Sequence, residues 1–428
     1  MHHILVLGAG KSATTLIESL LQDAYHQNWY VHVADVQLDV AEKKISGYDR
    51  AAAYRIEPNA PEQLNKLISM ADAVISMLPP PLHAKVAVKC LAHRKHFLNA
   101  SYLTPELLAL DAQAKEAGLT FLVEMGLDPG IDHMSAMEMI HDIQDRGGTI
   151  TSFRSHCGGL ISPESDDNPW HYKISWNPRN IVMAGKDGAH YFSGGQVCHI
   201  PYHELFNPDR TVHIPGLGNY AWYPNRDSIP YINTYGLTTV SDFVRTTLRH
   251  PDFSAGWRKI VELGLTSETK SINTDTLSFD QFLLQYLGDI EALGHPLKEQ
   301  FSFLLTHTHS PMHMGMMAPA DILQVLLENK LALGDGDRDM IVMLHELEYQ
   351  LPGSDQVLKK NASLVVKGKD PVHTAMARTV GLPLSIAVRN ILNGKIHRKG
   401  VFIPVYPDVY RIVLRDLEQK GISFTVTA

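Results

Sequence analysis

The stretch HILVLGAGKSATTLIESLLQ, residues 3–22, decides the fold of the first part of the chain. Its apolar start predicts a β-strand from His3 to Leu7, and apolar residues at helical spacing then predict a helix from Ala13 to Gln22. A glycine-rich turn joins the two. A strand that runs through such a turn directly into a helix is typical of the first unit of a nucleotide-binding parallel sheet.

The turn contains Gly8, Gly10, Lys11, Ser12 and Ala13, a Gly-x-Gly-x-x-Ala form of the dinucleotide fingerprint. In that fingerprint the first glycine permits the tight turn, the second lets a pyrophosphate approach the backbone, and the third small residue keeps the helix close to the sheet. The first N–H groups of the helix then face the phosphates. Alone the pattern is weak evidence, because a coincidental turn also fits it.

Asp35 strengthens this prediction and bears on which dinucleotide binds. It follows the next predicted strand, Tyr30 to Ala34, at about the ~20-residue spacing that the fingerprint requires. A carboxylate there accepts hydrogen bonds from both ribose hydroxyls and repels the additional phosphate of NADP. The sequence therefore predicts NAD as the cofactor, with NADP as the alternative. The competing interpretation is an aspartate in a surface turn.

The same alternation of strands and helices continues to about residue 130 and predicts a doubly wound parallel sheet, a Rossmann fold. The other predicted strands are Ala52 to Ile56, Ala73 to Met77, His96 to Asn99 and Thr120 to Glu124. The other predicted helices are Pro61 to Met70, Leu82 to Ala92 and Pro105 to Ala117, the last capped by Thr104.

Beyond residue 130 the sequence predicts two further parts. Alternating and aromatic segments broken by glycine and proline indicate a second, mixed α/β domain for substrate, formed by residues 131–240 and 355–428. Residues 241–354 read as a helical insertion, with helices at Asp242 to Arg249, Phe279 to Leu287 and Ala320 to Leu327. A strand ASLVVKGKD, a long helix from Pro371 to Leu392 and a final strand ISFTVTA complete the second domain.

A second glycine-rich bend follows the strand Thr120 to Glu124, in the string GLDPGIDH. It places Asp128, flanked by Leu127 and Pro129, at the carboxyl edge of the sheet, where such sheets bind ligands. The alternative is that Asp128 or Asp132 only caps the next helix. Leu78 and Pro79, after the strand ending at Met77, either form a wall near the cofactor or simply end the strand.

Composition narrows the class of protein. The chain has 428 residues, is 44% hydrophobic and carries a formal net charge of -8, which gives no reason to expect nucleic-acid or membrane partners. Its three cysteines have neither paired-bridge nor metal-ligand spacing, which favours a reducing compartment. The N-terminus enters a strand without a leader pattern, so we expect a cytoplasmic enzyme.

Further strings occur together with GLDPGIDH in one known family. They are NASY at Asn99 to Tyr102, SHCGGLISPESDDNPWHYKISW from Ser155, YPNRDS from Tyr223, RTTLR at Arg245 to Arg249 and TAMARTVGLP at Thr374 to Pro383. With these motifs the chain resembles the saccharopine dehydrogenase family over nearly its whole length, specifically the glutamate-forming branch, also called saccharopine reductase.

The resemblance implies three parts: a Rossmann domain, a mixed α/β substrate domain and a helical insertion, assembled as a homodimer. It also implies interconversion of saccharopine with L-glutamate and 2-aminoadipate 6-semialdehyde through an imine and nicotinamide hydride transfer. Family members often use NADP, so Asp35 departs from the expected pattern.

The resemblance also assigns roles to individual residues. Tyr102, Asp128 and Cys157 are the expected catalytic groups, although Cys157 also fits a small buried hydrophobe. The expected substrate contacts are Ser101, Arg226, Thr247, Leu248 and Arg249. The expected cofactor contacts are Gly8, Gly10, Lys11, Ser12, Ala13, Asp35, Leu78, Pro79, Leu127, Asp128, Pro129 and Trp176. Arg226 is the most persuasive carboxylate ligand, because guanidinium binds carboxylate in a bidentate manner; the alternative is a salt bridge with Asp227.

Two questions stay open in the sequence. The His- and Met-rich segment Thr306 to Met317 has side chains that ligate transition metals, but we expect a structural or lid role and no metal. Other function classes are a related amine dehydrogenase, such as carboxynorspermidine synthase or lysine dehydrogenase, and a noncatalytic nucleotide-binding protein.

Overall fold

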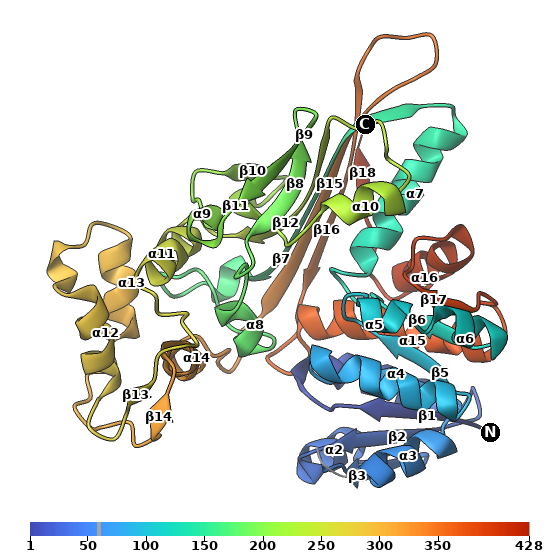
Figure 1. The fold of residues 1–428 in the computed structure, drawn as a ribbon, viewed down its shortest axis with the longest axis horizontal. Coiled ribbons are helices and arrows are strands. Elements are labelled where there is room, and N and C mark those ends of the chain that lie inside the picture. The colour runs from blue at the N-terminus through green and yellow to red at the C-terminus, as the bar shows by residue number, and fades with distance from the viewer. Residues whose placement is uncertain (58–60, 428) are drawn as a thin grey trace. The chain divides into compact units, whose positions relative to one another are not determined.

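The computed structural model describes residues 1–57 and 61–427, which form two compact units (Figure 1). The first unit comprises Met1–Asp145 and Val372–Thr425, and the second comprises Arg146–Pro371 and the end of the chain from Val426. Each unit is built around its own β-sheet.

The first unit contains a seven-stranded parallel sheet in the order β3-β2-β1-β4-β5-β6-β17. Its strands are β1 (His2–Leu7), β2 (Trp29–Asp35), β3 (Ala51–Arg55), β4 (Ala73–Ser76), β5 (His96–Asn99), β6 (Thr120–Leu122) and β17 (Gly400–Phe402). The run 3-2-1-4-5-6 is the strand order of a dinucleotide-binding Rossmann fold. The predicted Rossmann sheet is therefore confirmed, and all six predicted strands lie within one or two residues of the observed ones.

Helices connect these strands. They are η1 (Lys11–Ala13), α1 (Thr14–Ala24), α2 (Leu38–Ile45), α3 (Pro61–Met70), η2 (Pro80–Leu82), α4 (His83–Ala92), α5 (Pro105–Leu108), α6 (Asp111–Glu116), α7 (Ile131–Asp145), α15 (Ala375–Leu392) and α16 (Pro407–Gln419). The predicted helix at Pro105 is divided into α5 and α6, and Thr104 caps its start by accepting the Leu107 N–H at 3.4 Å.

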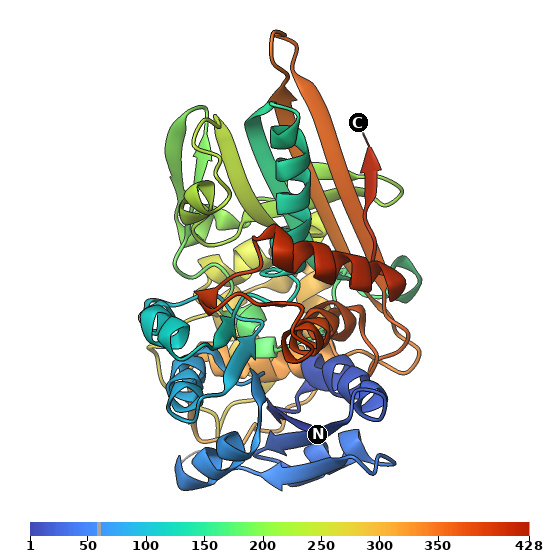
Figure 2. The ribbon, with the colours of Figure 1, turned by 90° about the vertical axis from the view of Figure 1, so that its right-hand side faces the viewer.

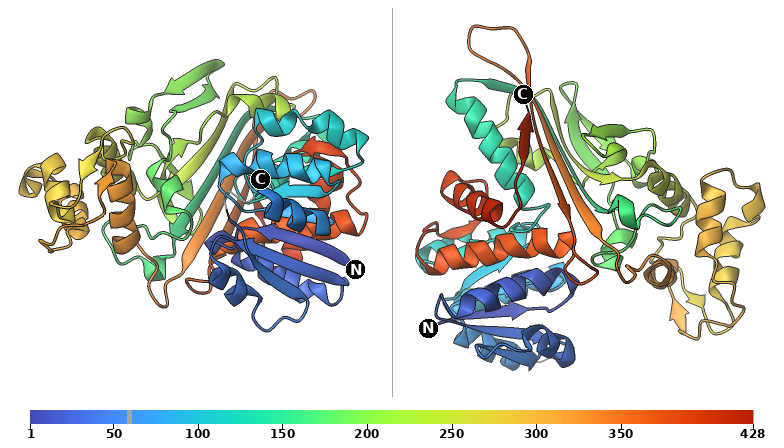
Figure 3. Two further views of the ribbon diagram at one scale, coloured as in Figure 1. Left: turned by 60° about the horizontal axis from the view of Figure 1, so that its bottom comes forward. Right: turned by 180° about the vertical axis from the view of Figure 1, so that it is seen from behind.

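The late segment from Val372 to Thr425 belongs to the first unit, whereas the sequence analysis placed it in the substrate domain. Helix α15 packs beside α1, as the right-hand view of Figure 3 shows. The contact is close because a Cβ added to Gly381 would lie 2.6 Å from the Leu16 backbone nitrogen. Strand β17 extends the parallel sheet by pairing with β6. The fold of this segment thus depends on partners hundreds of residues away in the sequence.

The second unit contains a mixed nine-stranded sheet with the path β10-β11-β12-β7-β15-β16-β18, to which β8 and β9 add through β12. Its strands are β7 (Thr149–Ile161), β8 (Ala189–Ser193), β9 (Gln196–Ile200), β10 (Thr211–Ile214), β11 (Gly218–Pro224), β12 (Asp242–Arg249), β15 (Asp339–Gln350), β16 (Leu358–Lys367) and β18 (Thr425–Thr427). The long β15–β16 hairpin stands out in Figure 2. The predicted mixed sheet is therefore confirmed.

Two of its central strands contradict the predicted extent of the helical insertion. The segment Asp242 to Arg249, predicted as a helix, is strand β12, which pairs with β11 on one side and β7 on the other. Strand β15, inside the predicted insertion, pairs with β7 along twelve residues and with β16 along ten. Both strands are nearly all buried, so their apolar residues do not alternate with polar ones as an exposed strand would.

The remaining helices of the second unit are no longer than twelve residues. They are η3 (Pro163–Ser165), α8 (Pro178–Val182), α9 (Tyr202–Leu205), α10 (Ile229–Thr234), α11 (Pro251–Glu262), α12 (Phe279–Leu287), η4 (Ile290–Ala292), α13 (Leu297–Leu304) and α14 (Pro319–Lys330), with a small ribbon of β13 (Ile272–Asn273) and β14 (Met316–Met317). Apart from η3 and α10, they contribute to an apolar core that includes Trp170 and Trp257. Among the described residues no helix is long and apolar enough to cross a membrane.

Candidate functional site

The turn after β1 has the backbone geometry of a phosphate-binding loop. Gly8 has a φ of +97°, and a Cβ there would lie 2.9 Å from the Met77 carbonyl oxygen, so only glycine fits. A Cβ on Gly10, by contrast, would meet no atom of the described residues within 4 Å, its two chain neighbours aside. This open side lies where η1 begins, and the first N–H groups of a helix have no acceptor within it. The residues therefore fit a pyrophosphate.

Asp35 lies at the end of β2, beside this turn. Its carboxylate accepts the Ala9 N–H at 2.7 Å through Oδ2 and the Gln37 N–H at 3.0 Å through Oδ1. These bonds fix the side chain, and each carboxylate oxygen retains a further lone pair for a ligand hydroxyl. The geometry fits the ribose position of a dinucleotide.

A hydrogen-bonded chain ties together the ends of β4 and β5. Ser76 Oγ lies 2.9 Å from His83 Nδ1, and His83 Nε2 lies 2.8 Å from Ser101 Oγ. Burial lowers the pKa of His83 to about 4, so the ring is neutral at pH 7. The chain fixes Ser101, one of the predicted substrate contacts. Leu78 and Pro79 follow β4 directly and lead into η2.

Glu124 fixes the segment that carries Tyr102. The Ser101 carbonyl accepts the Glu124 N–H at 3.1 Å, and Glu124 Oε1 accepts the Leu103 N–H at 2.8 Å, so both neighbours of Tyr102 are bound to one residue. Glu124 Oε2 also lies 2.7 Å from His133 Nε2. Both side chains of this pair are buried. The NASY segment and the start of α7 are thereby held together at the carboxyl edge of the sheet.

The bend that carries Asp128 is built on two glycines. A Cβ on Gly130, which has a φ of +149°, would lie 2.1 Å from the Gly126 carbonyl oxygen. The Gly126 N–H donates to the Pro129 carbonyl at 3.0 Å, and the Gly130 N–H donates to Asp132 Oδ1 at 2.6 Å. The sequence left open whether Asp128 or Asp132 has a purely local structural role. The structure gives such a role to Asp132. Leu127 and Pro129 are buried and Asp128 is half-buried at the tip.

Sequence reasoning did not assign roles to Ser76, His83, Glu124 and His133. His83 and His133 lie at the start of the helices after β4 and β6, the sequence positions that face the ligand edge of a parallel sheet. This position after a strand was the signal in the sequence that could have identified the two histidines. Their hydrogen-bond partners come from different strands, so no single sequence motif contains all of these partners.

In the second unit, Arg249 lies at the end of β12. Its side chain is only 4% exposed, its Nη1 donates to the Leu248 carbonyl at 2.8 Å, and its Nε has no hydrogen-bond partner among the described residues. The guanidinium lies 5.2 Å from the ring centre of Tyr172, whose hydroxyl accepts from Trp176 Nε1 at 3.3 Å. A buried guanidinium with donor capacity left is suited to binding a carboxylate.

Cys157 and Thr247 are neighbours in register on β7 and β12. Cys157 is 5% exposed, and Thr247 is half-buried. Leu248 points to the other face of the sheet, as alternation requires, where its side chain packs in an apolar cluster with Leu160 and Val342. Only the backbone atoms of Leu248 could therefore make the predicted substrate contact.

Arg226 lies just beyond the end of β11 in the left-handed backbone region, with a φ of +54°. The N–H of its neighbour Asn225 donates to the Arg245 carbonyl at 2.8 Å, which places Arg226 near the start of β12. Asp227 Oδ1 accepts the Ile229 N–H at 2.9 Å. Thr247 lies two residues before Arg249 on β12, with Cys157 beside it on β7, and Arg226 follows the neighbouring strand β11. The predicted site residues Tyr102, Asp128 and Ser101 belong to the first unit, and Cys157, Trp176 and the arginines belong to the second.

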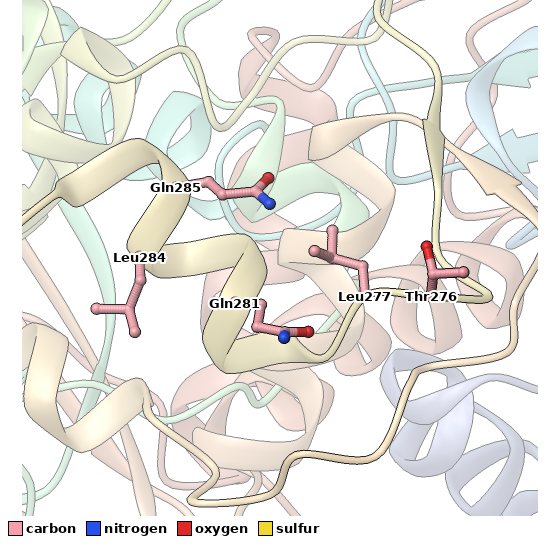
Figure 4. Close-up of a pocket in the computed structure, with 5 residues that line it drawn as sticks. All are labelled: Thr276, Leu277, Gln281, Leu284 and Gln285. Carbon is pink, nitrogen blue, oxygen red and sulfur yellow. The ribbon is translucent and has the colours of Figure 1, made fainter.

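The helical part of the second unit also has an open cavity of about 530 Å³ (Figure 4). It is lined by Thr276, Leu277, Gln281, Leu284 and Gln285. None of these side chains titrates near neutral pH or is nucleophilic enough for covalent chemistry. We therefore assign the cavity no catalytic role.

The fold and the turn after β1 define the first unit as a dinucleotide-binding Rossmann domain. A family model described as the saccharopine dehydrogenase NADP binding domain matches residues 4–122, and one described as the saccharopine dehydrogenase C-terminal domain matches residues 126–422. The chain belongs to the saccharopine dehydrogenase family. Its family and its nicotinamide dinucleotide cofactor are therefore as the sequence predicted.

Relatives match the chain along its whole length. A solved structure of saccharopine dehydrogenase (L-Glu forming) from Saccharomyces cerevisiae is 28% identical, with a TM-score of 0.89, covering 100% of this chain and 99% of that one. Saccharopine dehydrogenase (NADP(+), L-glutamate-forming) of Pyricularia oryzae is 29% identical over 97% of this chain and 96% of the relative. Alpha-aminoadipic semialdehyde synthase of Arabidopsis thaliana is 33% identical over 98% of this chain, which spans 44% of that relative. The chain is thus about half as long as the semialdehyde synthases that it matches.

Proposed function

We propose that the protein is an oxidoreductase that interconverts saccharopine with L-glutamate and 2-aminoadipate 6-semialdehyde. The reaction oxidises a secondary amine to an imine, which water then cleaves, or runs in reverse. The observation that carries the proposal is the placement of Arg249 at the end of β12 and of Arg226 beside the middle of the same strand, next to Arg245. The four-residue step from Arg245 to Arg249 is ~13 Å of strand, enough for carboxylates at both ends of an extended substrate.

The chain's own residues would bind the substrate and move protons. A bound nicotinamide dinucleotide supplies or accepts the hydride. Arg226 and Arg249 hold substrate carboxylates, and Thr247 adds a hydroxyl between them. Asp128 moves the proton on the substrate nitrogen or on the carbinolamine oxygen, and Tyr102 hydrogen-bonds the same centre. Cys157 contributes to the surroundings of that centre and not as a nucleophile, because it is nearly fully buried.

An initial-rate assay with saccharopine tests the function. Purified protein is mixed with saccharopine and NAD or NADP, and nicotinamide reduction is followed by absorbance. The expected result is turnover that needs saccharopine and that lysine or a carboxynorspermidine-type amine does not replace. Absence of turnover in protein that binds nucleotide, followed by turnover with another amine, would reassign the substrate. Absence of turnover with every amine would favour the noncatalytic alternative.

We further propose that NAD is preferred to NADP, on the strength of the Asp35 carboxylate beside the phosphate-binding turn. The fungal relatives named for NADP(+) make a direct test necessary. In an Asp35→Asn protein the side-chain amide keeps an acceptor for the Ala9 N–H while the charge is lost. Its ratio of kcat/KM for NAD over NADP is expected to fall at least about tenfold, a change of about 1.4 kcal/mol.

Asp39→Asn, in the exposed first turn of α2, is the matched control and should keep the wild-type ratio. An unchanged ratio in Asp35→Asn would remove Asp35 from cofactor selection while leaving the substrate assignment intact.

We also propose a cytoplasmic homodimer. The three free cysteines suit a reducing compartment. Cell fractionation tests the compartment, and sedimentation equilibrium tests the dimer; a monomeric sample with full activity would reject the dimer as a requirement for function.

A further inference from the structure

Four side chains outside the predicted active site meet in the second unit. His171 follows η3, His250 and Asp252 lie at the start of α11, and Asp166 lies at the end of η3. Imidazole and carboxylate atoms of His171, His250 and Asp252 all lie within 4.8 Å of one another. All four side chains are between 24% and 34% exposed, so an ion and a water molecule can reach them.

The separations suit a small divalent metal ion. His171 Nε2 lies 3.4 Å from Asp252 Oδ2, and His250 Nδ1 lies 3.7 Å from the same oxygen. Ligands about 2.1 Å from a tetrahedral zinc ion are about 3.4 Å from one another, as follows from the tetrahedral angle. No separation exceeds 4.8 Å, so the side chains would have to bring these atoms closer by at most about 1.4 Å to reach that geometry.

Asp166 supplies the outer interaction that metal-bound histidines usually have. Its Oδ2 lies 2.7 Å from His171 Nδ1, the ring nitrogen opposite to the one that faces Asp252. This bond orients the ring and leaves Nε2 as the ligand atom. Around His171, one carboxylate (Asp166) therefore orients the imidazole, and the other (Asp252) lies near its ligand nitrogen, as in a zinc-type site.

Charge also favours a cation here. The start of α11 is the positive end of the helix dipole, which by itself disfavours a cation. Asp166 and Asp252 together carry two negative charges, and neutral imidazoles add none. A divalent ion would balance the two carboxylates, and water molecules would complete its coordination.

We propose that His171, His250 and Asp252 bind a zinc-type divalent metal ion, with Asp166 orienting His171. The site joins the segment after η3 to the start of α11. It lies next in sequence to Tyr172 and Arg249, whose side chains stack on each other. The His- and Met-rich segment Thr306 to Met317 contributes no member to any such group among the described residues.

One local interaction competes with this arrangement. His250 Nδ1 accepts the Asp252 N–H at 3.2 Å as the cap of α11, so the ion must either replace this bond or use Nε2. His171 has no such capping role. It is therefore the better position for a substitution, because a change at His250 would also weaken the helix start.

The test measures metal binding to the full-length protein after treatment with EDTA. Zinc binding is followed by isothermal titration calorimetry, and cobalt(II) binding is followed by the visible absorption that tetrahedral cobalt gives with imidazole and carboxylate ligands. We expect one cobalt site per chain, displaced by zinc, with absorption lost in His171→Gln and affinity lowered about 10- to 100-fold in Asp166→Asn. His313→Gln, in the His- and Met-rich segment, is the matched control and should bind as wild type.

Each other result overturns the proposal. Absence of binding in the wild type would mean that the four side chains form only a hydrogen-bonded network. Equal binding in wild type and His171→Gln would place the ion elsewhere, and loss in His313→Gln would place it in the segment from 306 to 317. Circular dichroism of each variant checks that the fold is kept, and none of these readouts depends on enzyme activity.

Discussion

At the scale of single residues, three acids follow strand β6 within nine positions, and the structure gives two of them local structural roles. Glu124 binds the Leu103 N–H and His133, and Asp132 binds the Gly130 N–H. Asp128 lies between them at the tip of the bend and is half-buried. Its partial exposure at the tip of the bend places Asp128 to meet a ligand at the sheet edge.

Replacing Asp128 with asparagine separates its charge from its shape. Because proton transfer by a positioned side chain typically contributes 10²–10⁴-fold, kcat should fall about 100-fold or more. Nucleotide affinity, measured by fluorescence titration of NADH, should fall by a smaller factor than kcat, because Asp128 is one of several expected cofactor contacts. Asp49→Asn, at an exposed position of the same unit, is the control. Wild-type turnover in a folded Asp128→Asn protein would contradict the proposed role.

The sequence predicted those site residues that lie in contiguous motifs. Gly8, Gly10 and Asp35 follow a spacing rule, and the structure places them as that rule requires. The Ser76–His83–Ser101 chain was not predictable, because its three members come from the ends of two strands and one helix. Leu248 was assigned without strand alternation, which turns its side chain to the opposite face from Thr247.

At the scale of elements, the two glycine-rich turns of the first unit use glycine for different physical reasons. At Gly130 an added Cβ would overlap the backbone of Gly126. At Gly10 it would meet no described residue other than its chain neighbours, and the backbone there has an ordinary φ of −62°. The fold therefore requires glycine at position 130, whereas at position 10 the absence of a side chain leaves space for a ligand.

Alanine at each position should separate folding from binding. Gly130→Ala should lower the free energy of unfolding by about 2 kcal/mol or more, because the bend must rearrange around the new Cβ. Gly10→Ala should keep the wild-type melting temperature and weaken NADH binding at least about tenfold, which corresponds to ~1.4 kcal/mol. Thermal denaturation and fluorescence titration measure the two effects. A Gly10→Ala protein with normal affinity would mean that the pyrophosphate does not approach this residue.

Element type was hardest to predict where a strand is buried on both faces. Strand β12, predicted as a helix, contains Arg245 and Arg249, and both are nearly fully buried. Residues of β7 and β11 bond to both of its edges, and those partners decide its conformation. Propensity is a weak guide under such tertiary constraint.

At the scale of the whole molecule, the chain returns to the first unit after completing most of the second. Ser19 and Ser385 Oγ atoms lie 2.8 Å apart, and Arg389 binds both Asp23 at 3.2 Å and Asp416 at 2.9 Å. The contacts of Ser19 with Ser385 and of Asp23 with Arg389 each join residues 366 positions apart. A pattern read along the sequence gives the helix and strand here but not the sheet to which they belong, because pairing across that separation leaves no local signal.

The first unit also concentrates histidines that burial keeps neutral. Burial lowers the pKa of His32, His83 and His96 to about 4 each, with electrostatic repulsion from the neighbouring His3 adding to the effect at His32. In the unfolded chain a histidine has a pKa of about 6.5. Between these values the unfolded chain binds protons that the folded unit does not, so stability is full above pH 6.5 and is lost as pH falls toward 4.

His83, which is 2% exposed, gives the clearest test of this acid sensitivity. A shift from about 6.5 to about 4 corresponds to about 3 kcal/mol lost by pH 4 from this one side chain. In His83→Gln the free energy of unfolding should be lower at pH 7.5, because the bonds to Ser76 and Ser101 are weakened, but it should fall less steeply between pH 6.5 and 5. Urea denaturation at several pH values measures the slope, and His26→Gln, at an exposed position, should keep the wild-type slope. An equal slope in wild type and His83→Gln would mean that His83 is protonated in the folded protein and that its hydrogen-bonded chain does not require a neutral ring.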